Sequence, residues 1–136
     1  MKLLVDTWGW AAVADRGDAG HEAATEIFHR ARRSGGAVTS NFILDETFTL
    51  LFKRRPFDDA WHFTTDVVRS PFIDIQEVTG ARFSRAIELR KQFSDKPRIS
   101  FTDLSTMAIM VELGITDILT ADRHFTHVGF GFRALP

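Results

Sequence analysis

The sequence predicts an α/β domain with a short, mainly parallel central sheet flanked by helices on both faces. Short apolar runs of strand length alternate with segments of helix length from one end of the chain to the other. The 136 residues are the size of one domain, and no linker rich in Pro, Gly or Ser divides them. We therefore expect residues 1–136 to form a single domain.

The first quarter of the chain predicts a strand, two helices and a second strand. Lys2–Val5 is a short apolar run, which is typical of a buried strand. Thr7–Ala14 then favours a short helix and Ala19–Ser34 a longer one, which Gly35-Gly36 ends. Ala37–Thr39 is a brief second strand.

The next segment predicts two helices and a strand. Asn41–Lys53 is helical, with Ser40 or Asn41 as N-cap, and Pro56 marks its end. Phe57–Arg69 forms another helix, which Ser70-Pro71 closes. Phe72–Val78 alternates between apolar and polar residues, so it is predicted to be a strand.

The remaining elements continue the alternation. Gly80–Phe93 is predicted to be helical, and Ser94–Ser100 is a polar loop that contains a proline. Phe101–Leu113 is a helix followed by a glycine, which is a common helix stop. Asp117–Thr120 and Phe130–Leu135 complete the predicted sheet as two short strands.

The composition excludes several classes of protein. There are no cysteines, so disulfide scaffolds, zinc ribbons, thiol nucleophiles and iron–sulfur clusters are ruled out. The 17 basic and 18 acidic residues give a formal charge of −1, which does not support a strongly basic nucleic-acid clamp. Asp6 interrupts the first apolar run, which argues against a signal peptide, and no run is long enough for a membrane helix. We expect a cytoplasmic protein that does not associate with a membrane.

Four carboxylates fall where parallel strands end. Asp6 directly follows the first predicted strand, and Asp122 follows the strand that ends at Thr120. Asp103 opens the helix after the polar loop, and Glu46 lies one turn into the helix after the second strand. Sites in open parallel sheets lie at this edge, so we expect the four acids to meet there. Taken singly, the three aspartates also fit helix capping, which would give them only a structural role.

Glu46 is the hardest of the four to explain as a surface residue. Its helix neighbours Phe42, Ile43 and Leu50 are apolar, so we expect its carboxylate to be partly buried, which costs free energy unless the charge is compensated. Asp45 on the same helix has polar neighbours and is expected to be solvated.

Four acids that converge on one point repel one another and favour a bound cation. Ligands that are all oxygen select Mg²⁺ or Mn²⁺ rather than zinc. A magnesium ion held by carboxylates at a strand edge is typical of phosphoryl and phosphodiester chemistry, in which the metal activates a water molecule.

The residues around these acids resemble the PIN-domain nucleases, and among them the VapC-type toxins of type II toxin–antitoxin pairs. The resemblance covers essentially the whole chain in four segments, each with one of the acids: KLLVDTWGW, VTSNFILDETFTLLFKRR, ISFTDLSTMAIMVELGI and DILTADRHFTHVGF. Each segment alone is a weak signal. Their order and spacing together are specific.

This resemblance implies a single PIN domain over residues 1–136, with a three-layer α/β/α fold. It implies a metal-dependent endoribonuclease, usually a homodimer, that hydrolyses RNA phosphodiester bonds through a metal-activated water and is blocked by a cognate antitoxin. Asp6, Glu46, Asp103 and Asp122 match the catalytic and Mg²⁺- or Mn²⁺-binding acids. The family commonly places a Ser or Thr beside the acids, and Thr7 and Thr120 are the matching candidates, as supports for the ligands or for a water.

Alternatives remain open at this point. The chain could be a PIN-fold domain that binds RNA or protein without catalysis, or a PIN nuclease that acts without an antitoxin. A nuclease for branched DNA is less favoured because long insertions are absent. A haloacid-type phosphatase is disfavoured because Asp6-Thr7-Trp8 is not Asp-x-Asp. A zinc or nickel site at Asp122, His124 and His127 is also disfavoured, since short turns rarely present three such side chains together.

Two further sets of residues are candidates for contact with a partner. The candidate phosphate contacts are basic residues, which equally suit ordinary solvated surface: Lys53, Arg54, Arg55, Arg98 and Arg123. The three tryptophans suit a protein interface if they are exposed: Trp8, Trp10 and Trp61.

Overall fold

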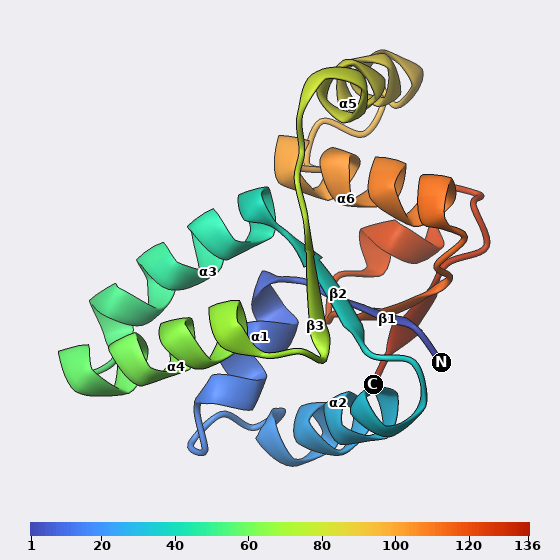
Figure 1. The fold of residues 1–136 in the computed structure, drawn as a ribbon. Helices are drawn as coiled ribbons and strands as arrows, with labels where there is room; N and C mark the ends of the chain where they lie inside the picture. The colour runs from blue at the N-terminus through green and yellow to red at the C-terminus, as the bar shows by residue number, and fades with distance from the viewer.

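A computed structural model describes all residues, 1–136, as five strands, six α-helices and one short 3₁₀ helix (Figure 1). The strands are β1 (Leu3–Val5), β2 (Ala37–Ser40), β3 (Ile73–Gln76), β4 (Asp117–Leu119) and β5 (Arg133–Leu135). The helices are α1 (Thr7–Ala14), α2 (His21–Ser34), α3 (Asn41–Arg54), α4 (Phe57–Arg69), α5 (Gly80–Gln92), α6 (Phe101–Leu113) and the 3₁₀ helix η1 (Arg123–Thr126).

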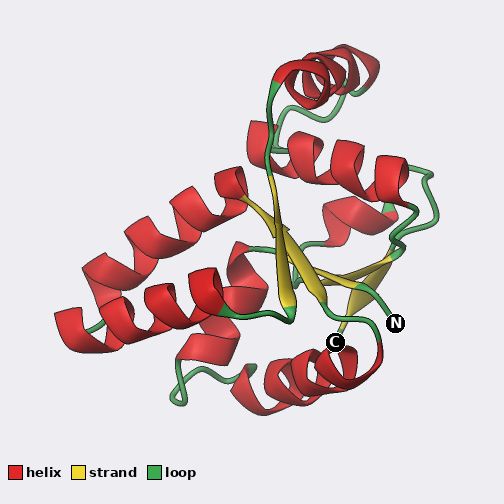
Figure 2. Ribbon diagram, in the orientation of Figure 1, coloured by secondary structure: helices red, strands yellow, loops and turns green.

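The five strands form one sheet in the order β3-β2-β1-β4-β5, and every neighbouring pair is parallel. The central strand β1 pairs with β2 on one side and β4 on the other. Helices cover both faces of the sheet, which gives three layers (Figure 2). The predicted α/β class and parallel sheet are therefore confirmed.

The direction of chain crossover reverses between β1 and β4. The chain builds outward from β1 through β2 to β3 and then returns to place β4 on the opposite side of β1. In open parallel sheets, the crevice beyond the carboxyl ends of two such strands is where ligands bind. The topology therefore points to the segments that follow β1 and β4.

Side-chain caps fix where two site-forming helices begin. The hydroxyl of Ser40 accepts a hydrogen bond from the backbone N–H of Ile43 at 3.1 Å and starts α3. The hydroxyl of Ser100 does the same for Asp103 at 3.0 Å and starts α6. Gly114, in the left-handed conformation with φ of 68°, ends α6.

One cluster of 27 buried apolar residues fills the space between the sheet and the helices. Trp10 lies inside it, and its indole N–H donates to the Thr39 hydroxyl at 3.0 Å, so its assignment to a partner interface was wrong. Trp61 is about half exposed and stacks on Phe57 with 6.0 Å between ring centroids. Trp61 therefore remains a candidate interface residue, and Trp10 does not.

The predicted last strand was three residues too long at its start. Gly129 and Gly131 have φ of 77° and 78°, in the left-handed region, so the backbone around Phe130 turns instead of extending. None of the helices has the combination of length and apolar character that spanning a bilayer requires.

Candidate functional site

The candidate site lies at the carboxyl edge of the sheet, where the order of strands reverses. β1 delivers Asp6 to this edge, and β4 delivers Thr120 and then Asp122. The first turn of α6 adds Asp103, and the second turn of α3 adds Glu46. Four segments that are far apart in the sequence therefore each contribute one acid.

Asp6 is the buried member of the group, with only 8% of its surface exposed. One carboxylate oxygen accepts a hydrogen bond from the Gly9 backbone N–H at 2.9 Å, and the other accepts one from the Thr120 hydroxyl. Burial raises the pKa of Asp6 to about 7, and these two hydrogen bonds only partly oppose the increase. The charges of Asp103 and Asp122 raise the pKa further, so they act on the same site.

Gly9 allows α1 to approach the end of β4 closely enough to hold Asp6 in place. A Cβ atom at this position would lie 2.7 Å from the backbone oxygen of Leu119 and 2.9 Å from Val5 Cγ1. Both distances are below normal van der Waals contact, so only glycine fits without movement of the backbone. Asp6 does cap α1, but its raised pKa shows an environment that capping alone does not require.

Asp103 is half-buried and also carries a perturbed charge. Burial, followed by the charge of Asp122, raises its pKa to about 6. The hydrogen bond with Ser100 lowers the pKa, while the charge of Glu46 raises it. The capping role of Ser100 and the electrostatic coupling of Asp103 to other acids are therefore both present.

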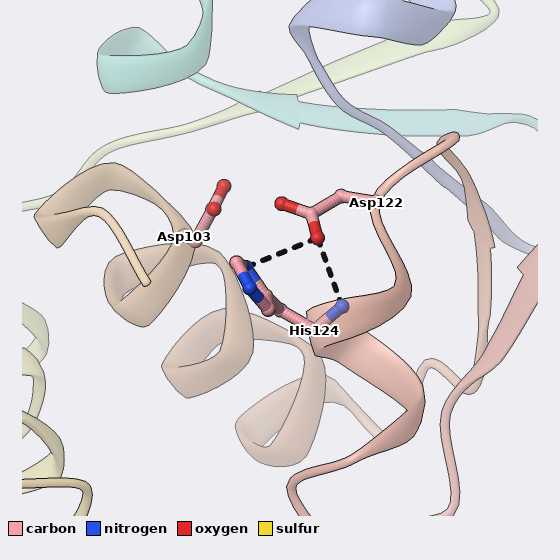
Figure 3. Close-up of side chains that lie close together, drawn as sticks. All are labelled: Asp103, Asp122 and His124. Carbon is pink, nitrogen blue, oxygen red and sulfur yellow. Dashed lines mark hydrogen bonds and ion pairs between the residues drawn. The ribbon is translucent and has the colours of Figure 1, made fainter. Parts of the chain in front are cut away.

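Asp122 and His124 lie next to Asp103 (Figure 3). Their potential ligand atoms all lie within 4.8 Å of one another, close enough to hold one metal ion. Asp122 Oδ1 accepts the backbone N–H of His124 at 2.8 Å and lies 3.1 Å from the Nδ1 atom of that ring. That second approach lacks hydrogen-bond geometry, and the buried Nδ1 has no hydrogen-bond partner. The 3.1 Å between Asp122 Oδ1 and His124 Nδ1 is about the separation of two adjacent ligands of an octahedral ion.

Glu46 reaches the site from α3, but the expectation that it is partly buried was wrong. Its side chain is exposed, because the buried stripe of α3 runs through Ile43 and Thr47 and leaves Glu46 beside it. The Thr7 hydroxyl donates to Glu46 Oε1 at 3.1 Å and thereby links α1 to α3. Asp45 is exposed, as expected.

No lysine or arginine forms an ion pair with any of the four acids. Their charges nevertheless act on one another, as the raised pKa values of Asp6 and Asp103 indicate. Oxygen donors that lack a protein cation, together with one free imidazole nitrogen, are chemically suited to a hard divalent ion. The chemistry of the donor set therefore fits the expected Mg²⁺ or Mn²⁺.

The predicted phosphate contacts differ in their surroundings. Arg55 forms ion pairs with Asp15 and Asp59, which occupy its guanidinium. Lys53, Arg54 and Arg123 are exposed. Arg98 lines a cavity of about 330 Å³ that His124 also lines.

Sequence reasoning undervalued His124 because it grouped this residue with His127 in a single turn. Asp103, from a helix about 20 residues earlier, takes the place of His127 in the observed group. The Asp-x-His spacing of Asp122 and His124, within a turn after a strand, was the available signal.

Comparisons with known proteins identify the family of the chain. The PIN domain family model matches residues 3–131, which is nearly the whole chain. The chain is 32% identical over 128 residues to the 23S rRNA-specific endonuclease VapC20 of two strains of Mycobacterium tuberculosis, and the match covers 94% of this chain and 95% of each relative.

Solved structures give the same result. The crystal structure of VapC20 from M. tuberculosis, described as a toxin that cleaves the sarcin–ricin loop, superimposes with a TM-score of 0.83 at 29% identity, covering 94% of this chain and 95% of that one. VapBC2 from Rickettsia felis, solved with a DNA fragment from its promoter, shares the fold with a TM-score of 0.77 at 14% identity over both full chains. The chain therefore belongs to the PIN-domain family and, within it, to the VapC-type endonucleases of toxin–antitoxin systems.

Proposed function

We propose that this protein is a metal-dependent endoribonuclease whose active site is formed by Asp6, Glu46, Asp103 and Asp122. The observation that carries the proposal is the convergence of these acids at the carboxyl edge of β1 and β4, where the ligand atoms of Asp103, Asp122 and His124 lie within 4.8 Å of one another. Burial and the neighbouring charges raise the pKa of Asp6 to about 7 and that of Asp103 to about 6. Both groups lie in a cluster of acids that no lysine or arginine neutralises, at the edge where the family's chemistry takes place.

Asp103 and Asp122 would hold the metal, together with Asp6 at the end of β1 and Glu46 on α3. His124 is an additional candidate, because a nitrogen donor suits Mn²⁺ better than Mg²⁺. When bound, a divalent ion supplies charge neutralisation and polarises the phosphate and the attacking water.

The surrounding residues of the chain fix the ligands in place. The Gly9 N–H and the Thr120 hydroxyl orient the Asp6 carboxylate, and the Thr7 hydroxyl orients Glu46. Hydrogen bonds of this kind lower the cost of assembling several negative charges around one point. Thr7 and Thr120 thus serve as supports for the catalytic acids.

RNA is the substrate that we assign to this site. The relatives in M. tuberculosis are named as 23S rRNA-specific endonucleases, so 23S rRNA is the first substrate to test. The solved structure of VapC20 is described as that of a toxin, which supports a cognate antitoxin as partner of this chain. Ribosomal RNA as substrate supports action in the cytoplasm. The proposed domain organisation is a single PIN domain over residues 1–136.

A homodimer is the proposed assembly. Apolar side chains on two helices of the same region remain exposed, namely Phe83 and Ile87 on α5 and Val111 on α6. Burial of these side chains against a second copy would be favourable. Light scattering after size-exclusion chromatography measures the mass directly, and a mass near that of one 15.4 kDa chain would contradict the dimer.

The function is tested by incubating purified protein with total bacterial RNA and with 23S rRNA, in Mg²⁺, Mn²⁺ or EDTA. Cleavage in Mn²⁺ or Mg²⁺ that EDTA stops, and that leaves 5′-phosphate and 3′-hydroxyl ends, is the expected result. The Asp6→Asn variant should lose at least about 10³-fold in rate. Tight Mn²⁺ binding without cleavage of any RNA would favour a binding domain instead.

A further inference from the structure

The cavity beside the acid cluster is built from two separate segments of the chain. The loop between α5 and α6 contributes residues 95–99, which include the acid Asp95, and the turn that contains η1 contributes His124 and His127. Its volume is about 330 Å³, which lies in the range of small-molecule sites. His124 belongs to both the cavity and the metal-binding group, so a ligand in the cavity lies next to the reacting phosphate.

Arg90 holds the loop side of this cavity in a fixed shape. Its guanidinium donates to three backbone carbonyl oxygens of the loop, those of Phe93 at 2.8 Å, Lys96 at 2.6 Å and Ile99 at 2.6 Å. A charged donor shared among three carbonyls stabilises one loop conformation. The cavity is therefore preorganised by the chain itself, which lowers the entropic cost of binding.

The lining of the cavity suits an anion with a flat, polar part. Arg98 forms no ion pair, so its guanidinium is free for a phosphate, whereas Lys96 pairs at 3.1 Å with Asp95, which also lines the cavity. His124 and His127 offer planar rings, and unpaired RNA bases stack on such rings and bond through their edges. A nucleotide combines both features in one ligand.

We propose that this cavity binds one nucleotide of the RNA strand, directly beside the scissile phosphate, with Arg98 on its phosphate and His127 against its base. The proposal rests on the proposed function, because it places the same RNA strand in both sites. The cavity then selects unpaired nucleotides, since a base in a duplex cannot enter it.

The binding test uses adenosine 5′-monophosphate as the probe and wild-type protein in EDTA, so that neither metal nor turnover is needed. The ring signals of His124 and His127 should shift in a saturable way in NMR spectra, while those of His21, His29 and His62 should not. Arg98→Ala should weaken this binding by about five- to tenfold. Absence of shifts at His124 and His127 would overturn the proposal.

The matched control is Arg33→Ala, which removes the same charge from the exposed end of α2 without altering the cavity. It should bind the probe as the wild type does. An equal loss of affinity in Arg33→Ala and Arg98→Ala would show that binding depends only on the net charge of the protein, and would overturn the proposal. Thermal unfolding of both variants verifies that they are folded.

Cleavage assays separate this proposal from the proposed function. If the wild type cleaves RNA and Arg98→Ala, alone or with His127→Ala, lowers kcat/KM by about tenfold or more, both are supported. If these variants cleave as fast as the wild type, the cavity proposal fails and the nuclease stands. If the wild type cleaves no RNA with any metal, the proposed function fails, whatever the probe shows.

Discussion

The two sides of the acid cluster have opposite environments. Asp6, at the end of β1, is buried, accepts two hydrogen bonds and has a pKa of about 7. Glu46, on α3, is exposed and accepts one hydrogen bond, from Thr7. Both are candidate ligands of the same ion, yet only Asp6 is held in a low-dielectric setting.

Because of this difference, the two carboxylates are expected to gain different amounts of free energy when they bind a cation. The strand-end acid is rigid and strongly destabilised as an anion, so a cation gains most from binding it. The helix acid is solvated, so it loses little free energy without a cation and contributes less when one binds. Predictions about stability therefore concern Asp6, and predictions about rate distinguish the two.

The largest expected effect is on the stability of the metal-free protein. The pKa of Asp6 is raised from 3.8 to about 7, so between these values the folded state binds a proton that the unfolded state lacks. The free energy of unfolding should therefore fall as pH rises through this window, by up to about 4 kcal/mol. Asp6→Asn removes this loss and should be the more stable protein at pH 8.

Urea unfolding in EDTA between pH 4 and pH 8 measures this effect. Because the pKa of Asp103 is raised from 3.8 to about 6, the free energy of unfolding of Asp6→Asn should still fall between these two pH values, but by less than that of the wild type. A wild-type protein that gains stability over this range relative to Asp6→Asn would show that Asp6 is not destabilised as an anion.

The next effect separates the two acids by rate. Glu46→Gln should lower the rate of RNA cleavage by about 10- to 100-fold, less than Asp6→Asn, because its carboxylate is exposed. Its stability should remain unchanged. Asp45→Asn, an exposed acid on the same helix, is the matched control and should cleave normally. Equal losses in Glu46→Gln and Asp45→Asn would exclude Glu46 from the site.

A third prediction tests how α1 supports the buried side. Gly9→Ala places a Cβ against the backbone of Leu119 and should destabilise the protein by about 1–3 kcal/mol. Gly17→Ala is the control, since its nearest neighbour is the flexible side chain of Asp15 at 3.3 Å. Thermal unfolding measures the stability of both variants. A fully stable Gly9→Ala variant would mean that α1 does not need this close contact with β4.

The smallest expected effect concerns the choice of metal. His124→Ala should weaken Mn²⁺ binding about three- to tenfold and Mg²⁺ binding less, because magnesium gains less from a nitrogen ligand. Pulsed electron paramagnetic resonance of bound Mn²⁺ reports coupled nitrogen nuclei directly. A wild-type spectrum without coupling to an imidazole nitrogen would remove His124 from the metal site.

Much of the fold follows from local signals in the sequence. The bounds of α1, α4 and α6 were predicted correctly, because caps, prolines and a glycine mark their ends. The strands were less accurate: β3 is shorter than predicted at both ends, and β5 begins late because two glycines turn the chain before it. Strand ends depend on neighbouring strands, which local patterns do not contain.

The four acids could be named as candidates from the sequence, because the carboxyl ends of parallel strands meet at one edge of the sheet. The exposure of Glu46 could not be predicted, since apolar neighbours on a helix do not fix which side faces the core. The proximity of His124 to Asp103 could not be predicted either, because only the fold places the start of α6 beside η1. The contact from Arg90 to the loop spans up to nine residues and has no sequence signal.

Calorimetric titration of Mn²⁺ into wild-type protein and Asp6→Asn at pH 7 tests the central claim most directly, because it needs no RNA. The wild type should bind Mn²⁺ and release about half a proton from Asp6, measured in buffers of different ionisation enthalpy. Asp6→Asn should bind at least about tenfold more weakly and release less. Equal binding by both proteins, or no binding by the wild type, would contradict the claim that this buried carboxylate belongs to a metal site.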